Sequence, residues 1–216
     1  MQEPLRMVTN FTDLLNKEYG SGMDKEASEY MRFILESARH MQILVSDLLE
    51  YSRVDSEESN PKNVDCRSHT DLAIANLQEI IEETHARITV GELPTIHANP
   101  VRFSRLMQNL IGNAIKYRRE GTVPEISIMA EDKGHEWLFS VRDNGIGMKE
   151  EYLEQIFVIF KRLHGKKDYK GTGIGLAVCK KIVDSFGGSI WAESTLGEGS
   201  TFHFTIPKKD SPEKAV

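Results

Sequence analysis

The sequence predicts an α+β protein in which a helical hairpin precedes a two-layer α/β sandwich. Three observations predict this fold class. A heptad pattern of apolar residues runs through the N-terminal part of the 216-residue chain. Farther on, several short segments have the character of strands, and two of them are joined by the hairpin signal Asp132-Lys133-Gly134. Helical segments accompany these strands without strict βαβ alternation, which favours one layer of strands and one of helices.

The N-terminal hairpin is predicted from apolar spacing. Residues 3–19 form the first helix, and Gly20-Ser21-Gly22 ends it. Its apolar positions are Leu5, Val8, Phe11 (or Thr12) and Leu15. Residues 24–54 form a longer helix. Its stripe advances in steps of four and three through Ala27, Met31, Ile34, Ala38, Met41, Val45 and Leu48. One hairpin supplies only two helices of a four-helix bundle, so we expect a homodimer.

The pattern changes after the hairpin, and four regions are predicted. Residues 1–56 make the dimerisation hairpin, and residues 57–64 are a polar linker that contains Pro61. Residues 65–208 make a second domain. The acidic, polar residues 209–216 are expected to be a disordered tail.

The second domain is predicted to contain three helices and five strands. The helices cover residues 70–83, 100–117 and 174–186. The strands cover residues 86–90, 125–131, 136–142, 189–194 and 200–207. Asn99 is the expected N-cap of the middle helix, and Pro100 is its first residue. The helix over 70–83 is expected to bury Leu72, Ile74 (or Ala75), Leu77, Ile80 and Ile81.

Composition excludes some classes of function. The net charge of −6 argues against broad binding to nucleic acid or to anionic lipid, because both need a basic surface. No run of about 18 apolar residues is present, so no membrane span is predicted. The two cysteines, Cys66 and Cys179, are too few and too far apart for a disulfide framework or a zinc site. We therefore expect a reducing compartment.

The segment 109–117 is the first of four that point to nucleotide binding. Asn109, Asn113 and Lys116 (or Tyr117) fall on one helical face at spacings of three and four. Amide oxygens can ligate a hard cation such as Mg²⁺, and lysine offsets phosphate charge. A solvated helix face explains the same pattern equally well when the segment is taken alone.

The segment 143–148 is the second, and it directly follows a strand rich in apolar residues. The Asp143 carboxylate can accept a hydrogen bond from an exocyclic amine such as that of adenine. Gly145 and Gly147 let the backbone come close to a flat ring. The alternative is a plain turn, since Asn-Gly is common in turns, and this alternative is favoured for the segment alone.

The segments 171–176 and 197–201 complete the set. Glycines 171, 173 and 175 precede a helix, where backbone N–H groups can face an anion. Their spacing fits neither the dinucleotide fingerprint nor a Walker motif. Together with the basic stretch 161–167, they are interpreted as a lid over phosphates. Alone, each of these segments is a glycine-rich loop, a solvated charge run or a β-turn, but the order of all four within about 100 residues argues against chance.

With these segments the chain resembles the sensor histidine kinases, whose ATPase domain also occurs in gyrase-type topoisomerases, a heat-shock chaperone and mismatch-repair ATPases. Segment 109–117 looks like the N box of that family, 143–148 like G1, 156–163 like the F box, 171–176 like G2 and 197–200 like G3. The resemblance covers nearly the whole chain. Residues 157–165 look most like phytochrome-type kinases. The resemblance implies the histidine-kinase/gyrase-type ATPase fold for the second domain.

The resemblance also implies the ligands, ATP and Mg²⁺, and the role of each segment. Asn113 would be the Mg²⁺ ligand, Asn109 would lie near the γ-phosphate, and Lys116 would meet phosphate. Tyr117 would pack on adenine, and Asp143 would take its amine. Further binding residues are expected at Gly145, Gly147, Lys161, Arg162, Gly171, Thr172, Gly173, Ile174, Gly175, Leu176 and Thr201.

The implied function is transfer of the ATP γ-phosphoryl group to a histidine, and then to an aspartate of a response-regulator receiver domain. Residues 2–6 match the end of the family's phosphoacceptor segment, whose histidine would lie two positions before Met1. We therefore expect this chain to bind ATP without autophosphorylating at the usual site, because of truncation rather than natural loss. His40 and the other histidines are expected to be ordinary solvated or core residues.

An alternative function is that of a catalytically silent scaffold, which binds nucleotide and docks a response regulator. A stand-alone ATPase of the same fold is disfavoured by the heptad hairpin in front of the ATPase segments. The expected location is the cytoplasm, either for a free protein or for the cytoplasmic part of a larger, membrane-bound sensor.

Overall fold

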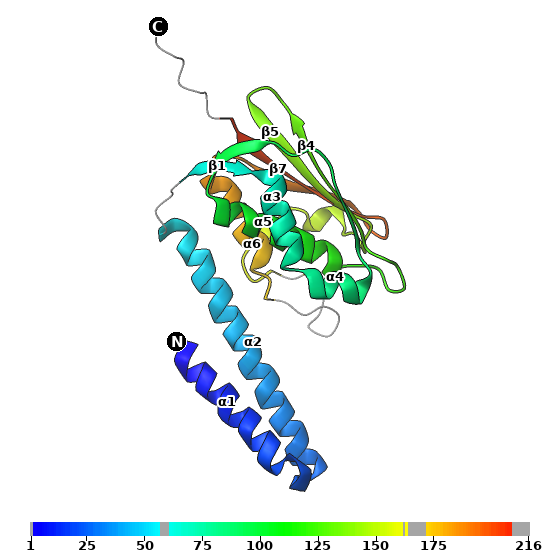
Figure 1. Ribbon diagram of the computed structural model, residues 1–216. Helices are drawn as coiled ribbons and strands as arrows, with labels where there is room; N and C mark the ends of the chain where they lie inside the picture. Colours follow the sequence, from blue (N-terminus) through cyan, green and yellow to red (C-terminus); the bar gives the residue numbers. More distant parts are fainter. Residues whose placement is uncertain (1, 57–60, 162, 164–171, 209–216) are drawn as a thin grey trace. The chain divides into compact units, whose positions relative to one another are not determined.

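The computed structural model describes residues 2–56, 61–161, 163 and 172–208. The chain divides into two compact units, Met1–Arg53 and Val54–Val216 (Figure 1). The predicted α+β class is confirmed, with a helical hairpin followed by a sheet-based domain. Among the described helices, none has the length and apolar character that crossing a bilayer requires.

The first unit is the predicted hairpin. Helix α1 spans Gln2–Tyr19, a 3-10 turn spans Gly20–Gly22, and α2 spans Lys25–Ser56. The side chain of Asp24 caps α2, because its Oδ1 accepts a hydrogen bond from Ala27 N at 2.7 Å. An ion pair of 2.9 Å between Arg39 and Asp13 joins the two helices.

The predicted heptad stripe of α2 divides between two surfaces. Ala38 of the stripe is buried in the hairpin, together with Leu35 of α2 and with Thr9 and Thr12 of α1. Three large side chains of the stripe are exposed, Ile34 by 48%, Met41 by 44% and Leu48 by 43%, whereas Met31 and Val45 are half-buried. On α1, the apolar positions Val8, Phe11 and Leu15 are exposed as well. These six exposed residues are called the apolar stripe below. A single hairpin leaves them in contact with water.

The second unit is built on a five-stranded sheet in the order β2-β4-β5-β7-β6. The strands span Arg87–Val90 (β2), Glu125–Asp132 (β4), Glu136–Asp143 (β5), Ile190–Thr195 (β6) and Gly199–Pro207 (β7). Strands β2 and β4 are parallel, and the other neighbours are antiparallel. The predicted β4–β5 turn is confirmed, since Gly134 N donates to Asp132 Oδ1 at 2.8 Å.

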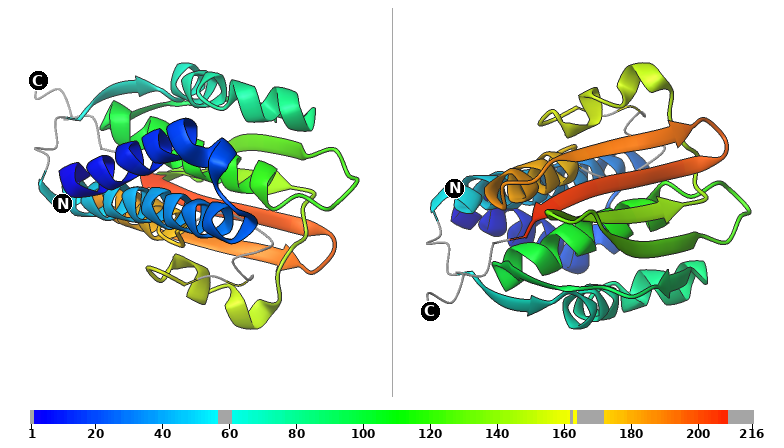
Figure 2. Two further views of the ribbon diagram at one scale, coloured as in Figure 1. Left: turned by 90° about the horizontal axis from the view of Figure 1, so that it is seen from below. Right: turned by 90° about the horizontal axis from the view of Figure 1, so that it is seen from above.

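Helices cover one face of this sheet (Figure 2). Helices α5 (Pro100–Lys116) and α6 (Gly175–Ser185) contact the strands, and α3 (Cys66–Ala75) packs beside α5. Helix α5 begins as predicted, with Asn99 Oδ1 accepting hydrogen bonds from Val101 N and Arg102 N. Short 3-10 turns at Glu150–Tyr152 and Gln155–Phe157 follow β5. The two layers match the predicted sandwich.

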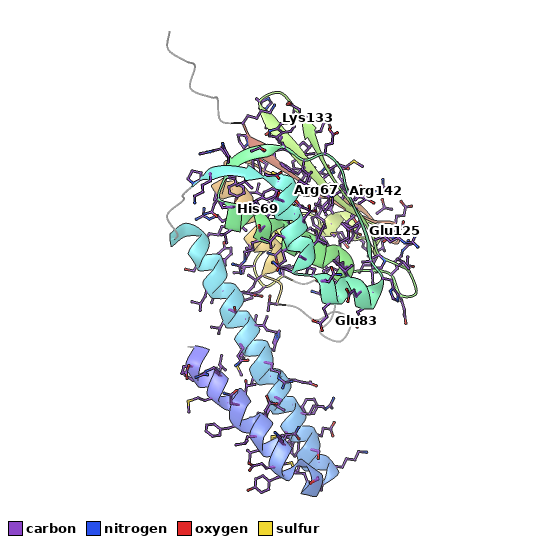
Figure 3. All side chains as sticks on the ribbon, in the orientation of Figure 1. Arg67, His69, Glu83, Glu125, Lys133 and Arg142 are labelled. Carbon is purple, nitrogen blue, oxygen red and sulfur yellow. The ribbon has the colours of Figure 1, made fainter. Side chains whose placement is uncertain are left out.

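The core lies between the layers and contains a cluster of aromatic rings. Phe139 of β5 stacks on Phe204 of β7 with ring centroids 4.7 Å apart. Phe103 of α5 meets Phe139 edge to face, at 5.8 Å. All three side chains are completely buried. Residues that alternate with them face the other way. Figure 3 shows Arg142 and Glu125 near one end of the sheet and Lys133 at the opposite turn.

Residues 62–64 were expected in the linker, but together with Asp65 they form strand β1 (Lys62–Asp65). This strand pairs with β3 (Thr95–Ala98), which the sequence analysis also missed. Each strand has only four residues, too few for a clear period-two pattern. Burial explains the pairing, since Val64 and Ile96 are both nearly inaccessible.

The helix expected over 70–83 is two helices, α3 and α4 (Gln78–Thr84), because Leu77 leaves the helical conformation with a φ of −107°. The expected buried face was wrong at Leu72, which is 50% exposed, whereas Ile74, Leu77, Ile80 and Ile81 are half-buried. The fully buried residues of α3 are Cys66, Thr70 and Ala73. The threonine is accommodated because its hydroxyl donates to Cys66 O at 2.7 Å. A small-residue face therefore packs on α5, which a search for large apolar residues overlooks.

We expect Phe139→Ala to lower the free energy of unfolding by about 3–5 kcal/mol, because it removes the central ring of the aromatic cluster and leaves a cavity. Urea unfolding followed by circular dichroism measures this loss. Val101→Ala is the control, since Val101 is 66% exposed, and it should change stability by less than about 0.5 kcal/mol. Similar losses in the two variants would contradict the packing described.

Candidate functional site

Asp143, the last residue of β5, holds the centre of the candidate site. Its Oδ1 accepts hydrogen bonds from Gly145 N at 2.8 Å and from Ser200 N at 3.2 Å. Burial raises the pKa of Asp143, and the hydrogen bonds from the two backbone N–H groups oppose the rise. No described residue donates a hydrogen bond to Oδ2. The carboxylate is thus fixed through one oxygen, and the other oxygen can accept a bond from a ligand.

The loop after Asp143 packs so closely against neighbouring segments that its glycines leave no room for a side chain. A Cβ at Gly145 would lie 2.5 Å from Tyr117 O, at the end of α5. A Cβ at Gly147, whose φ is +61°, would lie 2.0 Å from Thr195 O, at the end of β6. Backbone hydrogen bonds accompany both contacts, including one of 2.9 Å from Ile146 N to Tyr117 O. The glycines therefore bring α5, β5 and β6 to one place.

Helix α5 brings the predicted amides and lysine to the same region. Asn109, Asn113 and Lys116 are all half-buried on α5. Lys116 Nζ donates to the hydroxyl of Tyr117 at 3.0 Å and lies 4.5 Å from the centre of its ring. The start of α6 lies next to Asn109, because a Cβ at Gly175 would be 3.2 Å from Asn109 Oδ1. Two predicted segments, 109–117 and 171–176, are thus in contact.

The first turn of α6 offers backbone N–H groups without a side-chain cap. Its N-cap is Ile174, whose side chain is completely buried, so any contact of Ile174 with a ligand comes from its backbone. The N–H groups at the start of a helix have no partner within the helix, and the helix dipole favours an anion there. Thr172 Oγ1 accepts a hydrogen bond of 3.4 Å from Ile174 N. Gly173, with a φ of +77°, accepts one from Phe160 N.

The remaining predicted residues have different positions. Leu176 is half-buried in the first turn of α6, and Lys161 is exposed. Arg162 and Gly171 lie outside the described residues. Thr201 pairs with Arg142 of β5 and with Glu193 of β6. Because its neighbour Phe202 is buried in the core, the side chain of Thr201 faces away from the helices.

A pocket of about 210 Å³ opens where β5 and β6 end and β7 begins. It is lined by Arg142, Asp143, Glu193, Ser194, Thr195, Glu198, Gly199, Ser200 and Thr201. The lining is polar, and it includes the predicted residues Asp143 and Thr201. Asn109, Asn113 and Lys116 of α5 do not line it, so the described pocket extends from Asp143 along the strands.

Sequence reasoning missed Ser200, whose backbone N–H fixes the Asp143 carboxylate. Ser200 alternates with the buried Phe202 and Phe204 of β7, while Thr201 alternates with His203. Side chains alternate between the two faces of a strand. Ser200 is therefore on the face of β7 that is turned toward the helices, and Thr201 is on the opposite face. Ser194 was missed too, although its hydroxyl accepts a hydrogen bond from Met148 N at 2.9 Å and donates one to Gly199 O at 2.8 Å.

Comparisons with known proteins agree with this geometry. A family model described as "Histidine kinase-, DNA gyrase B-, and HSP90-like ATPase" matches residues 98–210. Cyanobacterial phytochrome A of Nostoc sp. (strain PCC 7120 / SAG 25.82 / UTEX 2576) is 48% identical over 207 residues, which make up 96% of this chain and 27% of that protein. The chain thus spans about a quarter of the length of this relative.

Two solved structures share the fold over nearly the whole chain. Full-length ShkA in complex with AMPPNP has a TM-score of 0.72 and 26% identity, with coverage of 99% of this chain and 45% of that chain. The histidine kinase ThkA in complex with the response regulator protein TrrA has a TM-score of 0.66 and 24% identity, with coverage of 98% and 60%. The second of these likenesses concerns the fold alone.

We expect Asp143→Asn to raise the free energy of unfolding at neutral pH. Burial raises the pKa of the folded carboxyl, so its ionisation costs folding free energy above that pKa, and this cost disappears as the pH falls and the group protonates. The extra free energy of unfolding of the variant should therefore decrease as the pH falls toward the range in which an unfolded aspartate is protonated. Urea unfolding over a pH series measures it. A wild type more stable than the variant at neutral pH would contradict the assignment.

Proposed function

The chain belongs to the family of histidine kinase-, DNA gyrase B- and HSP90-like ATPases, and we propose that it is the ATP-binding catalytic core of a two-component sensor histidine kinase. The observation that carries the proposal is the position of Asp143. A buried carboxylate at a strand end has one oxygen fixed by two backbone N–H groups, next to a glycine loop and to a helix with two amides on one face. Similarity to a phytochrome over 96% of the chain supports the histidine-kinase branch of the family.

The base end of ATP would bind at the loop after β5. Asp143 Oδ2 would accept a hydrogen bond from the exocyclic amine of adenine, and the backbone at Gly145 and Gly147 would approach the flat ring. Tyr117 would pack against the base from the end of α5. Ser200 would hold the carboxylate in place, and Thr201 would line the pocket farther along β7. Selectivity for adenine would then follow from an acceptor aimed at its amine.

The phosphates would bind between α5 and the start of α6, where the local chemistry fits an anion. Backbone N–H groups from Thr172 to Leu176 would face the anion, and Ile174 N would first give up its hydrogen bond to Thr172 Oγ1. Lys116 would offset phosphate charge, after exchanging its hydrogen bond to Tyr117. Lys161, Arg162 and Gly171 complete the proposed lid.

The amide oxygens near the phosphates fit a magnesium ion. Hard cations prefer oxygen ligands, and Mg²⁺ in nucleotide sites takes few of them from the protein. Asn113 would supply the ligand, and Asn109, one turn earlier, would contact the γ-phosphate. Bound Mg²⁺ neutralises charge that develops on the phosphates during transfer. Among the described residues, no group of three or more His, Cys, Asp or Glu side chains is arranged to hold a metal ion. The amide pair is our candidate for the ion.

The proposed reaction is transfer of the γ-phosphoryl group to a histidine. An imidazole nitrogen forms a bond to the γ-phosphorus while the bond to the bridging oxygen breaks and ADP leaves. The residues of this chain would position the phosphates and neutralise them, rather than react covalently. The group would then pass to an aspartate of a response regulator. The fold is shared with a kinase solved in complex with a response regulator protein, which supports this choice of partner.

The apolar stripe of the hairpin supports a homodimer. Ile34, Met41 and Leu48 follow one another at heptad spacing and are 43–48% exposed in a single hairpin. A second hairpin would bury them in a four-helix bundle. Because less than half of each side chain is still exposed, completing its burial would contribute about half of the roughly 1.5–3 kcal/mol of a full burial. The same bundle would present the docking surface for the response regulator.

The proposed location is the cytoplasm. Cys66 and Cys179 are buried free thiols. Burial raises the pKa of Cys66 to about 12 and also raises that of Cys179. Both thiols therefore stay protonated and unreactive, as suits a structural role in a reducing compartment where ATP is available.

We expect Asp143→Asn to weaken the binding of both ATP and ADP by roughly 10–100-fold, whether or not Mg²⁺ is present, because it places an amide donor against the amine of the base. Asn113→Ala should weaken binding by a similar factor only when Mg²⁺ is present. Isothermal titration calorimetry measures both effects.

Asp71→Asn is the control for these titrations. Asp71 is an exposed carboxylate on α3 that pairs with Arg67, and its variant should bind nucleotide as the wild type does. A wild type that fails to bind ATP would refute the proposed function. If the wild type binds nucleotide and Asp143→Asn leaves the Kd unchanged, the base binds at another site.

We expect Met41→Glu to convert the dimer to a monomer, because it would bury a charge in the apolar stripe of the bundle. Analytical ultracentrifugation gives the oligomeric state. The matched control is Glu36→Lys, which changes charge on the opposite side of α2, where the side chain of Glu36 is 61% exposed. A wild type that sediments as a monomer would rule out the proposed dimer.

A further inference from the structure

Two segments of the second unit are held against each other at the end of the sheet. The first is the base loop, residues 143–148, and the second is the β6–β7 turn, residues 195–199. Gly197 N donates to Ile146 O at 2.7 Å, which is a direct backbone bond between them. On the other side, the Ser194 hydroxyl accepts a bond from Met148 N. Both segments lie next to Asp143, the residue proposed to bind the base.

Arg119, which belongs to none of the predicted motifs, joins these two segments. It lies in the connection between α5 and β4 and is half-buried. Its Nε donates to Asn144 O in the base loop at 3.0 Å, and its Nη1 donates to Gly197 O in the turn at 3.0 Å. One guanidinium group therefore bonds a main-chain carbonyl on each side. A guanidinium is planar and rigid, so the positions of its two donors fix the spacing of the two acceptors.

We propose that Arg119 is a positioning residue for nucleotide binding, which sets the separation between the base loop and the β6–β7 turn. The inference rests on the proposed function, because it concerns the same site. Arg119 acts through the backbone that surrounds Asp143 and does not itself contact the nucleotide. Its removal leaves two carbonyls without a charged donor, so that the hydrogen bonds from Gly197 N to Ile146 O, from Met148 N to Ser194 Oγ and from Ser200 N to Asp143 Oδ1 must hold the two segments together.

A direct role in neutralising phosphate is the competing explanation for an arginine at this site. It disagrees with the geometry, because Nε and Nη1 both bind main-chain oxygens at the base end of the site. The two explanations predict different patterns of loss. A residue that positions the base loop affects every adenine nucleotide equally, whereas a residue that binds phosphate affects ATP more than ADP.

The test compares Arg119→Ala, Arg119→Lys and the control Arg87→Ala in the full chain. Arg87 is an arginine of the same unit whose side chain is 74% exposed and contacts Glu125. We expect Arg119→Ala to raise the Kd of ATP and of ADP by the same factor of about ten, with or without Mg²⁺. Arg119→Lys keeps the charge but lacks the fork, so it should recover only part of the affinity. Arg87→Ala should have no effect.

Hydrogen exchange of the nucleotide-free protein provides a second readout that needs no ligand. Amide exchange in segments 143–148 and 195–199 should accelerate in both Arg119 variants and should stay unchanged in Arg87→Ala. Unchanged exchange and unchanged Kd in the Arg119 variants would overturn the inference, as would a loss for ATP several times that for ADP. If the wild type binds no nucleotide, the proposed function fails, and the exchange data alone decide whether Arg119 braces the two segments.

Discussion

The hydrogen bonds to Asp143 Oδ1 are the interaction on which the rest of the site depends. They join Gly145 and Ser200, the second of which is 57 positions away in the sequence. Through them the end of β5, the base loop and the start of β7 take up one arrangement. Burial opposes ionisation of the carboxyl, and these bonds favour it. The site thus keeps a buried acceptor at some cost in stability, as is common for functional groups.

The fold was predictable where a segment is long and strongly patterned. Helices α1, α2, α5 and α6 and the β4–β5 hairpin lie within a few residues of their expected positions, because each carries a cap, a glycine or a repeated apolar face. Strands β1 and β3 were missed because four residues give little periodicity. Neither the break between α3 and α4 at Leu77 nor the face on which small residues of α3 rather than Leu72 are buried was apparent from the sequence.

The site was predictable at the level of motifs and less so at the level of single contacts. The segments 109–117, 143–148 and 171–176 come from distant parts of the sequence. In the fold, the first segment contacts each of the other two. Ser200 could have been found from strand alternation. Arg119 could not, because no periodicity or motif marks a side chain in an irregular connection that bonds two main-chain carbonyls. Only the folded arrangement of the base loop and the β6–β7 turn reveals its role.

The decisive measurement is a crystal structure of the chain with Mg²⁺ and a non-hydrolysable ATP analogue. We expect the exocyclic amine of adenine within hydrogen-bond distance of Asp143 Oδ2, with the phosphates beside the first turn of α6 and the ion on the amide oxygen of Asn113. An analogue bound elsewhere, or an adenine amine that makes no contact with Asp143, would contradict the proposed site.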